Sequence, residues 1–160
     1  MDESTRILAR IDELFREQRF AVLATKRDDA QPYGSLVAFA ATEDLRHIVF
    51  ATLRGTRKFR NIVTEPRVAL VIDNRSNDEA DLRRAMAVTA LGTAREIDRE
   101  QESQWSPLLL AKHPAMTDFV ATADCALLVV KVTSYLAVTE FQHVTELQPG
   151  PDGFQPAETT

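Results

Sequence analysis

Short apolar segments separated by short polar turns recur along most of this chain, and they constrain its fold more than any other feature. Each segment is shorter than a typical helix, and several are rich in β-branched residues, which is typical of β-strands. Because the connecting turns are short, neighbouring strands should pair in antiparallel fashion. The expected strands cover residues 20–26, 33–41, 47–53, 67–73, 86–97, 124–132 and 135–141, with a continuation through 143–147.

Three other segments have the pattern or the composition of helices. Residues 4–18 place apolar side chains at helical spacing and charged side chains on the other faces, as in an amphipathic helix. Residues 56–63 predict a second helix, which should end before Pro66 because the residue preceding a proline avoids the helical region. Residues 98–112 are helical in composition, although Pro107 should kink or split that helix.

Several of the expected strands are apolar on both faces and therefore need cover on both sides, as in a barrel packed by helices or by a second subunit. We therefore predict a mainly β fold with flanking helices, built around a closed or split antiparallel barrel of six or seven strands. The chain has 160 residues, which fits one domain, and we assign that domain to residues 1–148. Residues 149–160 hold three prolines and two glycines and are expected to form a disordered tail.

The composition excludes several classes of protein. The formal net charge is −5 and the sequence pI is about 5.2, which argues against a general nucleic-acid binder because phosphate recognition needs a basic face. The single cysteine, Cys125, can form neither an intrachain disulfide nor a multi-thiolate metal site, and no metal site is predicted. The charged N-terminus lacks a signal-peptide core, and no run approaches the roughly 18 apolar residues of a membrane span. We expect a soluble, cytoplasmic protein that binds neither nucleic acid nor membranes.

The segment from residue 49 to residue 71 carries the clearest sign of binding chemistry. An expected strand delivers Thr52, a short loop follows, and Thr56, Arg57 and Lys58 open the expected helix. A helix N-terminus offers unpaired backbone N–H groups and a partial positive charge, which suit an anion. The threonines add hydroxyl donors, Arg57 can grip two phosphate oxygens, and Lys58 adds a compact charge. The segment thus predicts a phosphate site, although the same residues would also suit an ordinary capped and solvated helix start.

A series of short motifs runs in a fixed order along much of the chain. It consists of LAT at residues 23–25, AQP at 30–32, SLV at 35–37, VFAT at 49–52, TRK at 56–58, EP at 65–66, RVAL at 67–70 and VTALGTA at 88–94. In order and spacing, this series resembles the pyridoxamine 5′-phosphate oxidase-like, FMN-binding split-barrel proteins over roughly residues 7–97. The resemblance implies a split barrel that binds FMN at a homodimer interface.

The same resemblance implies the roles of individual residues. Arg57 and Lys58 would bind the FMN phosphate, with Thr52 and Thr56 assisting, and the strand at 35–37 would run beside the flavin with its backbone groups facing the ring edge. The implied cofactor-binding residues are therefore Arg57, Lys58, Thr52, Thr56, Ser35, Leu36 and Val37. No catalytic acid or base stands out, and a hydride-transfer site need not have one.

Departures from the family pattern narrow the expected activity. Ser35 and Ala40 stand where the oxidases of the family carry an arginine and a lysine, and their C-terminal substrate clamp is not visible. Oxidation of pyridoxamine phosphate is therefore not expected. The leading interpretation is an FMN-binding flavoprotein, an oxidoreductase that acts on an unknown small molecule as a homodimer with the cofactor site at the interface.

Other interpretations stay open at the level of sequence. One is a non-enzymatic flavin- or haem-binding protein, another is a deazaflavin-dependent reductase, and a third is a structural barrel without a cofactor. His47, His113 and His143 are far apart in sequence and share no metal-ligand spacing. Trp105 could stack on a flavin from the partner subunit, but packing on its own helix face is the default expectation.

Overall fold

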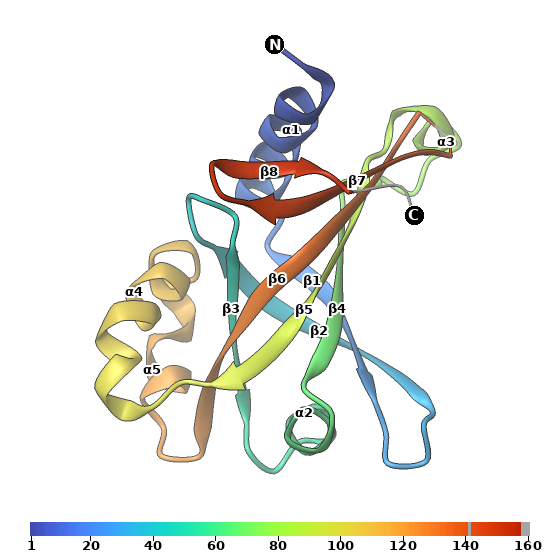
Figure 1. Ribbon diagram of the computed structural model, residues 1–160. Helices are drawn as coiled ribbons and strands as arrows, with labels where there is room; N and C mark the ends of the chain where they lie inside the picture. The colour runs from blue at the N-terminus through green and yellow to red at the C-terminus, as the bar shows by residue number, and fades with distance from the viewer. Residues whose placement is uncertain (141, 158–160) are drawn as a thin grey trace.

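The computed structural model describes residues 1–140 and 142–157. Its strands form an eight-stranded antiparallel sheet in the order β3-β2-β1-β4-β5-β6-β7-β8, and an additional pairing of β3 with β6 closes the first six into a barrel (Figure 1). The predicted mainly β fold with a split antiparallel barrel is therefore confirmed. The strands are β1 (Phe20–Lys26), β2 (Pro32–Ala41), β3 (His47–Leu53), β4 (Arg67–Asp73), β5 (Ala87–Glu96), β6 (Cys125–Thr139), β7 (His143–Gly150) and β8 (Gly153–Pro156).

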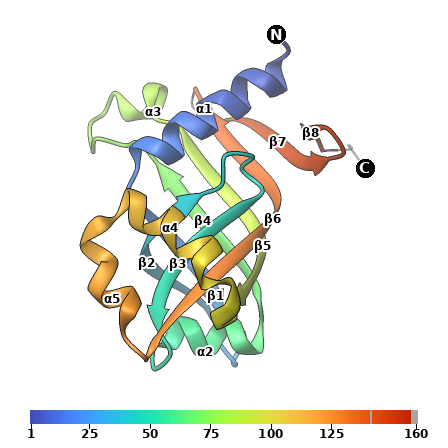
Figure 2. The same ribbon diagram turned by 90° about the vertical axis from the view of Figure 1, so that its left-hand side faces the viewer.

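Helices cover the two ends and one side of the barrel. They are α1 (Glu3–Glu17), α2 (Arg57–Thr64), α3 (Asp81–Arg84), α4 (Glu102–Lys112) and α5 (Thr117–Ala121). α1 and α2 lie at opposite ends of the barrel, whereas α4 and α5 lie beside β3 and β6 (Figures 1 and 2). The Asp2 carboxylate begins α1 by accepting the backbone N–H of Thr5 at 2.8 Å, as an N-cap does.

The apolar core has two parts, which explains why some strands are apolar on both faces. Inside the barrel, fully buried side chains such as Leu23, Phe39 and Leu70 pack with the apolar side of α1. Outside the barrel, Val49 of β3 and Val129 of β6 belong to a second cluster with α4 and α5. Because these helices cover the outer surface of β3 and β6, both strands can bury side chains on either face.

A β-bulge interrupts the antiparallel pairing of β5 with β6. β6 is one continuous strand, whereas the sequence predicts two strands over residues 124–132 and 135–141; Phe141 itself lies outside the described residues. The register of β5 against β6 shifts at Gly92. A Cβ atom at Gly92 would come within 2.5 Å of the Lys131 carbonyl oxygen, so only glycine fits between the two backbones.

The end of the chain departs most from the sequence-based expectation. Residues 149–156, expected to be disordered, complete β7 and form β8, and the two strands make a hairpin that extends the sheet. The Phe154 ring lies 5.3 Å from the Tyr135 ring, and the Arg46 guanidinium lies 5.9 Å from the centroid of Phe154. These contacts anchor a segment whose proline and glycine content suggested disorder. Residues 158–160 of the predicted tail lie outside the described part of the chain.

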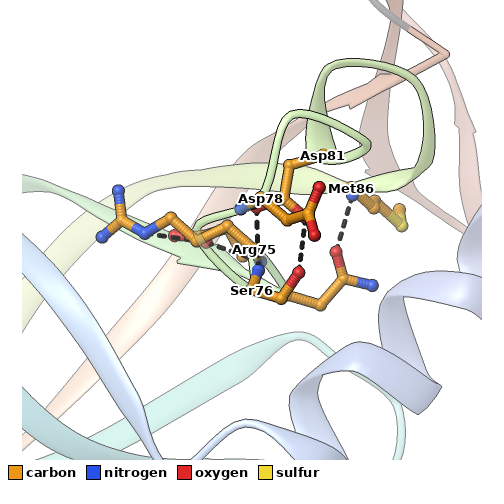
Figure 3. Close-up of polar contacts among 7 residues, drawn as sticks. Arg75, Ser76, Asp78, Asp81 and Met86 are labelled. Atoms are coloured by element: carbon orange, nitrogen blue, oxygen red, sulfur yellow. Dashed lines mark hydrogen bonds and ion pairs between the residues drawn. The ribbon is translucent and has the colours of Figure 1, made fainter.

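The loop between β4 and β5 is organised by its own side chains (Figure 3). The Asp81 carboxylate accepts hydrogen bonds from the Ser76 N–H at 2.9 Å, the Ser76 hydroxyl at 3.0 Å and the Asp78 N–H at 3.1 Å. The bond from the Ser76 backbone is the main reason why the pKa of Asp81 is lowered. Asn74 accepts the N–H of Met86 at 2.7 Å and so joins the two ends of the loop.

Candidate functional site

The barrel is split between β2 and β3. The two strands pair only over Phe39–Ala41 and Ile48–Phe50, although both extend beyond this short ladder. Continued in the same register, the ladder would set Val37 opposite Thr52. At that point β3 instead keeps β6 as its partner, and β2 keeps β1. The gap therefore opens toward the end of β3, where the chain enters α2.

The edge of β2 presents backbone hydrogen-bonding groups to this gap. The Phe39 N–H points toward β1, because it donates to the Arg19 carbonyl at 3.4 Å. Backbone groups of a strand alternate in direction, so the N–H and C=O of Leu36 point the other way, toward β3. No ladder partner faces Leu36 on that side in the described residues. The split therefore offers one free donor and one free acceptor from the backbone of β2.

The start of α2 is fixed by two threonine hydroxyls. Thr56 is the N-cap: its Oγ1 accepts the Phe59 N–H at 3.4 Å and donates to the Leu53 carbonyl at 2.8 Å. Thr52 Oγ1 lies 3.0 Å from Thr56 Oγ1, and it must be the donor because the Thr56 proton is already used. The sequence suggested that these hydroxyls assist a phosphate directly. In the structure both hydroxyl protons are spent on positioning the helix start.

Arg57 and Lys58 follow this N-cap, and their charged groups have no partner among the described residues. Within the described residues, neither side chain makes a hydrogen bond or an ion pair. Their backbone N–H groups also have no acceptor, since the helical bonds begin with Arg60 N–H donating to Thr56 C=O at 3.3 Å. The α2 start thus combines two cations, two free N–H groups and the positive end of a helix dipole. A donor set of this kind suits a phosphate group.

Ser35 adds a buried hydroxyl on the same stretch of β2. Its Oγ is inaccessible to solvent and has no hydrogen-bond partner among the described residues. Burial alternates along β2, and Ser35 shares the inward side with Val37 and Phe39. Most buried hydroxyls find a hydrogen-bond partner, so an unpaired one at this position of β2 is unusual.

The structure places all the predicted cofactor residues at one end of the barrel, on the two sides of the split. The β2 side holds Ser35, Leu36 and Val37, and the β3–α2 side holds Thr52, Thr56, Arg57 and Lys58. Sequence reasoning missed one buried contact that holds these sides in place: Asn61 Nδ2 of α2 donates to Thr25 Oγ1 of β1 at 3.0 Å. An asparagine among the apolar positions of an amphipathic helix was the available signal.

The outer surface of the barrel next to the split is apolar and uncovered by helices. Phe20 and Leu36 are 55% and 64% exposed, and Val22 and Leu91 also belong to the exposed apolar side chains. Strand register makes them neighbours, because Val22 pairs with both Leu36 and Val71. Together these outward side chains of β1, β2, β4 and β5 form what we call the outer apolar face.

Trp105 and the three histidines each have a partner within the described residues. Trp105 is buried under α4 with Val49 of β3, as the default expectation had it, and its ring meets the His47 ring edge-on at 5.3 Å. Burial lowers the pKa of His47. His113 Nε2 lies 2.8 Å from the Phe39 carbonyl, and His143 Nε2 lies 3.2 Å from a Glu3 carboxylate oxygen. Across residues 1–140 and 142–157, no group of three or more His, Cys, Asp or Glu side chains is placed to hold a metal ion.

The geometry of the split and the order of the motifs agree with a known family. The family model described as pyridoxamine 5′-phosphate oxidase matches residues 7–135. The chain belongs to this family. The match includes both sides of the split, and it confirms the resemblance inferred from the motifs. Among curated proteins, none matches the chain.

Solved structures share the fold at low sequence identity. A haem-binding protein from Mycobacterium smegmatis superposes with a TM-score of 0.75 at 18% identity, over 86% of this chain and 57% of that protein, so the present chain spans little more than half its length. A FAD-binding protein from Mesorhizobium loti gives a TM-score of 0.65 at 16% identity, over 81% of this chain and 91% of that one. HutZ, the haem storage protein of Vibrio cholerae, gives 0.63 at 17% identity, over 78% and 88%. In the described part of the chain, no helix is long and apolar enough to cross a membrane.

Proposed function

We propose that this protein is a flavoprotein that binds FMN at the β2–β3 split and acts as an oxidoreductase on a small molecule. The observation that carries the proposal is the uncommitted cation pair Arg57 and Lys58 at the free N–H groups of α2, beside the open edge of β2. The site lies inside the matched family region.

The chain's own residues would bind and orient the cofactor. The Arg57 guanidinium and the Lys58 ammonium would hold the phosphate together with the two free N–H groups, and Thr52 and Thr56 would keep that helix start in position. The backbone N–H and C=O of Leu36 would meet polar atoms on the edge of the ring system. When bound, FMN would supply the hydride and electron transfer.

A second copy of the chain would complete this site. The outer apolar face leaves Phe20 and Leu36 largely exposed directly beside the split, and large apolar patches of this kind usually mark contact surfaces. Because the face begins at Leu36, whose backbone also lines the gap, a partner packed there would cover both. The proposed active form is therefore a homodimer with its cofactor at the interface.

Haem is the second candidate ligand, because two of the similar structures are named as haem-binding or haem storage proteins. The position of the histidines favours flavin instead. His113 is held against the Phe39 carbonyl, His47 is packed on Trp105, and His143 pairs with Glu3. A deazaflavin would use the same phosphate donors as FMN and would differ in its absorbance spectrum.

Visible absorbance spectra with added FMN, deazaflavin or haem would test the proposal, followed by titration of the group that is retained. Removing both cations with Arg57→Ala and Lys58→Ala should weaken FMN binding at least about a hundredfold, since each charge-assisted hydrogen bond contributes about 1.5–3 kcal/mol. The matched control, Arg83→Ala with Lys131→Ala, removes two exposed cations away from the split and should leave the affinity unchanged. A wild-type protein that retains no FMN, or equal affinities for the two double variants, would refute the assignment.

A further inference from the structure

A surface hollow of about 380 Å³ lies along α2, next to the proposed phosphate site. Its lining comes from α2, from the loop before α2 and from the turn between β1 and β2. The edge of β2 that faces the split contributes none of it. The residues that line the hollow include Arg54, Arg57, Arg60, Asn61, Val63 and Asp28.

The three arginines of the hollow differ in how far they are free to bind an anion. Arg54 is neutralised, because its guanidinium donates to the Glu96 carboxylate at 2.5 Å and 3.0 Å. Arg60 commits one N–H to the Gly55 carbonyl at 2.8 Å, and Arg57 makes no hydrogen bond with the described residues. A guanidinium has five N–H donors, so Arg57 and Arg60 keep most of theirs for a ligand. Planar guanidinium groups match phosphate oxygens especially well.

Two further residues suit a nucleoside better than a simple anion. Val63 is 70% exposed and gives the hollow an apolar surface, against which a base could lie. The Asp28 carboxylate makes no ion pair with the described residues and can accept a hydrogen bond from a sugar hydroxyl or a base amino group. A site for inorganic phosphate would gain nothing from the valine and would be weakened by the carboxylate. A nucleotide uses the arginines, the valine and the carboxylate together.

We propose that the hollow binds the adenylate half of FAD, so that the site accepts FMN but prefers the dinucleotide. This inference rests on the proposed flavin function. Arg57 links the two regions, since it opens α2 and also lines the hollow, and it can therefore bridge the two phosphates of a pyrophosphate. The hollow lies at the phosphate end of the bound flavin and takes no part of its lining from the split, so it suits an extension of the cofactor rather than a substrate that must reach the ring.

Dissociation constants for FMN and FAD would test this inference, measured by flavin fluorescence on the full chain. In the wild type, FAD should bind about tenfold more tightly than FMN, which corresponds to about 1.4 kcal/mol. Arg60→Gln should abolish this preference and change the FMN constant by less than about twofold, because the Arg60 side chain is not among the groups proposed to hold the FMN phosphate. Val63→Glu changes an exposed side chain and should also remove the preference, so the result does not depend on one variant folding well. Arg10→Gln on α1 is the matched control.

The outcomes separate this inference from the proposed function. FMN and FAD binding with equal affinity to the wild type, or Arg60→Gln weakening both flavins alike, would overturn the dinucleotide assignment and leave the flavin function standing. Adenosine 5′-monophosphate that binds the FMN-saturated protein, without any preference for FAD, would assign the hollow to a separate nucleotide and also overturn it. If neither flavin binds, the proposed function and the inference fall together.

Discussion

Gly92 lies at the bulge between β5 and β6, and replacing it with alanine should destabilise the barrel. The added Cβ would lie 2.5 Å from the Lys131 carbonyl oxygen and 2.6 Å from Val130 Cγ1, whereas ordinary contacts begin at 3.4 Å. The backbone of β6 would have to retreat by about 0.9 Å, the difference between these distances, across a ladder that also carries the bulge. Overpacking of this kind costs about 1–3 kcal/mol, and the upper half of that range applies because the obstacle is backbone.

Urea denaturation at constant pH would measure this cost as a change in the free energy of unfolding. We expect Gly92→Ala to lose about 2–3 kcal/mol, with a melting temperature lower by about 5–10 °C. Gly55→Ala is the matched control, because no atom lies within 4 Å of its added Cβ and its stability should stay level or rise by about 0.4–1 kcal/mol. A loss below about 0.5 kcal/mol for Gly92→Ala, or an equal loss in both variants, would refute the reasoning about the backbone contact at Gly92.

Two further predictions concern α4 and the outer apolar face. Burial lowers the pKa of Lys112 in the folded protein to about 8, whereas a lysine in the unfolded chain has a pKa near 10.5. Between these two pH values the unfolded chain binds more protons than the folded protein, so the free energy of unfolding should rise with pH across that window. Lys112→Met should abolish this rise; an unchanged slope of the unfolding free energy against pH would contradict the pKa. Leu36→Glu should convert the proposed dimer to monomers in size-exclusion chromatography with light scattering, whereas Val144→Glu, an equally apolar exposed position on β7, should not. Monomeric wild type, or dimeric Leu36→Glu, would argue against the proposed interface.

Local sequence patterns predict many of the strands of this fold. The predicted bounds at 20–26, 47–53 and 67–73 agree with β1, β3 and β4, because each strand is a compact apolar run between polar turns. The β3–β6 pairing that closes the barrel joins segments far apart in sequence, and no local pattern encodes it. The sequence predicts two strands over residues 124–132 and 135–141, whereas Thr133 and Ser134 continue a single strand β6 past the bulge at Gly92.

In the candidate site, too, some features could be predicted from the local sequence and others depend on tertiary structure. Arg57 and Lys58 are adjacent in sequence, so their pairing with a helix start could be predicted without a structure. The use of Thr52 to hold Thr56 depends on how a strand end and a helix cap meet in space. The split itself is an end of the pairing between β2 and β3, and the hollow along α2 depends on the position of the turn that carries Asp28. Both are tertiary features, which short-range patterns do not specify.

The way β3 is held has a consequence for motion at the split. Along its whole length, from His47 to Leu53, β3 is bonded to β6, while β2 pairs with β3 only from Phe39 to Ala41. One wall of the gap is therefore anchored, and the other ends in the unbonded amide of Leu36. A molecule that formed hydrogen bonds with this amide would take the place of the β3 backbone, which does not pair with β2 here. Hydrogen exchange should then slow at Leu36 on binding, while the amides that β3 shares with β6 stay protected throughout.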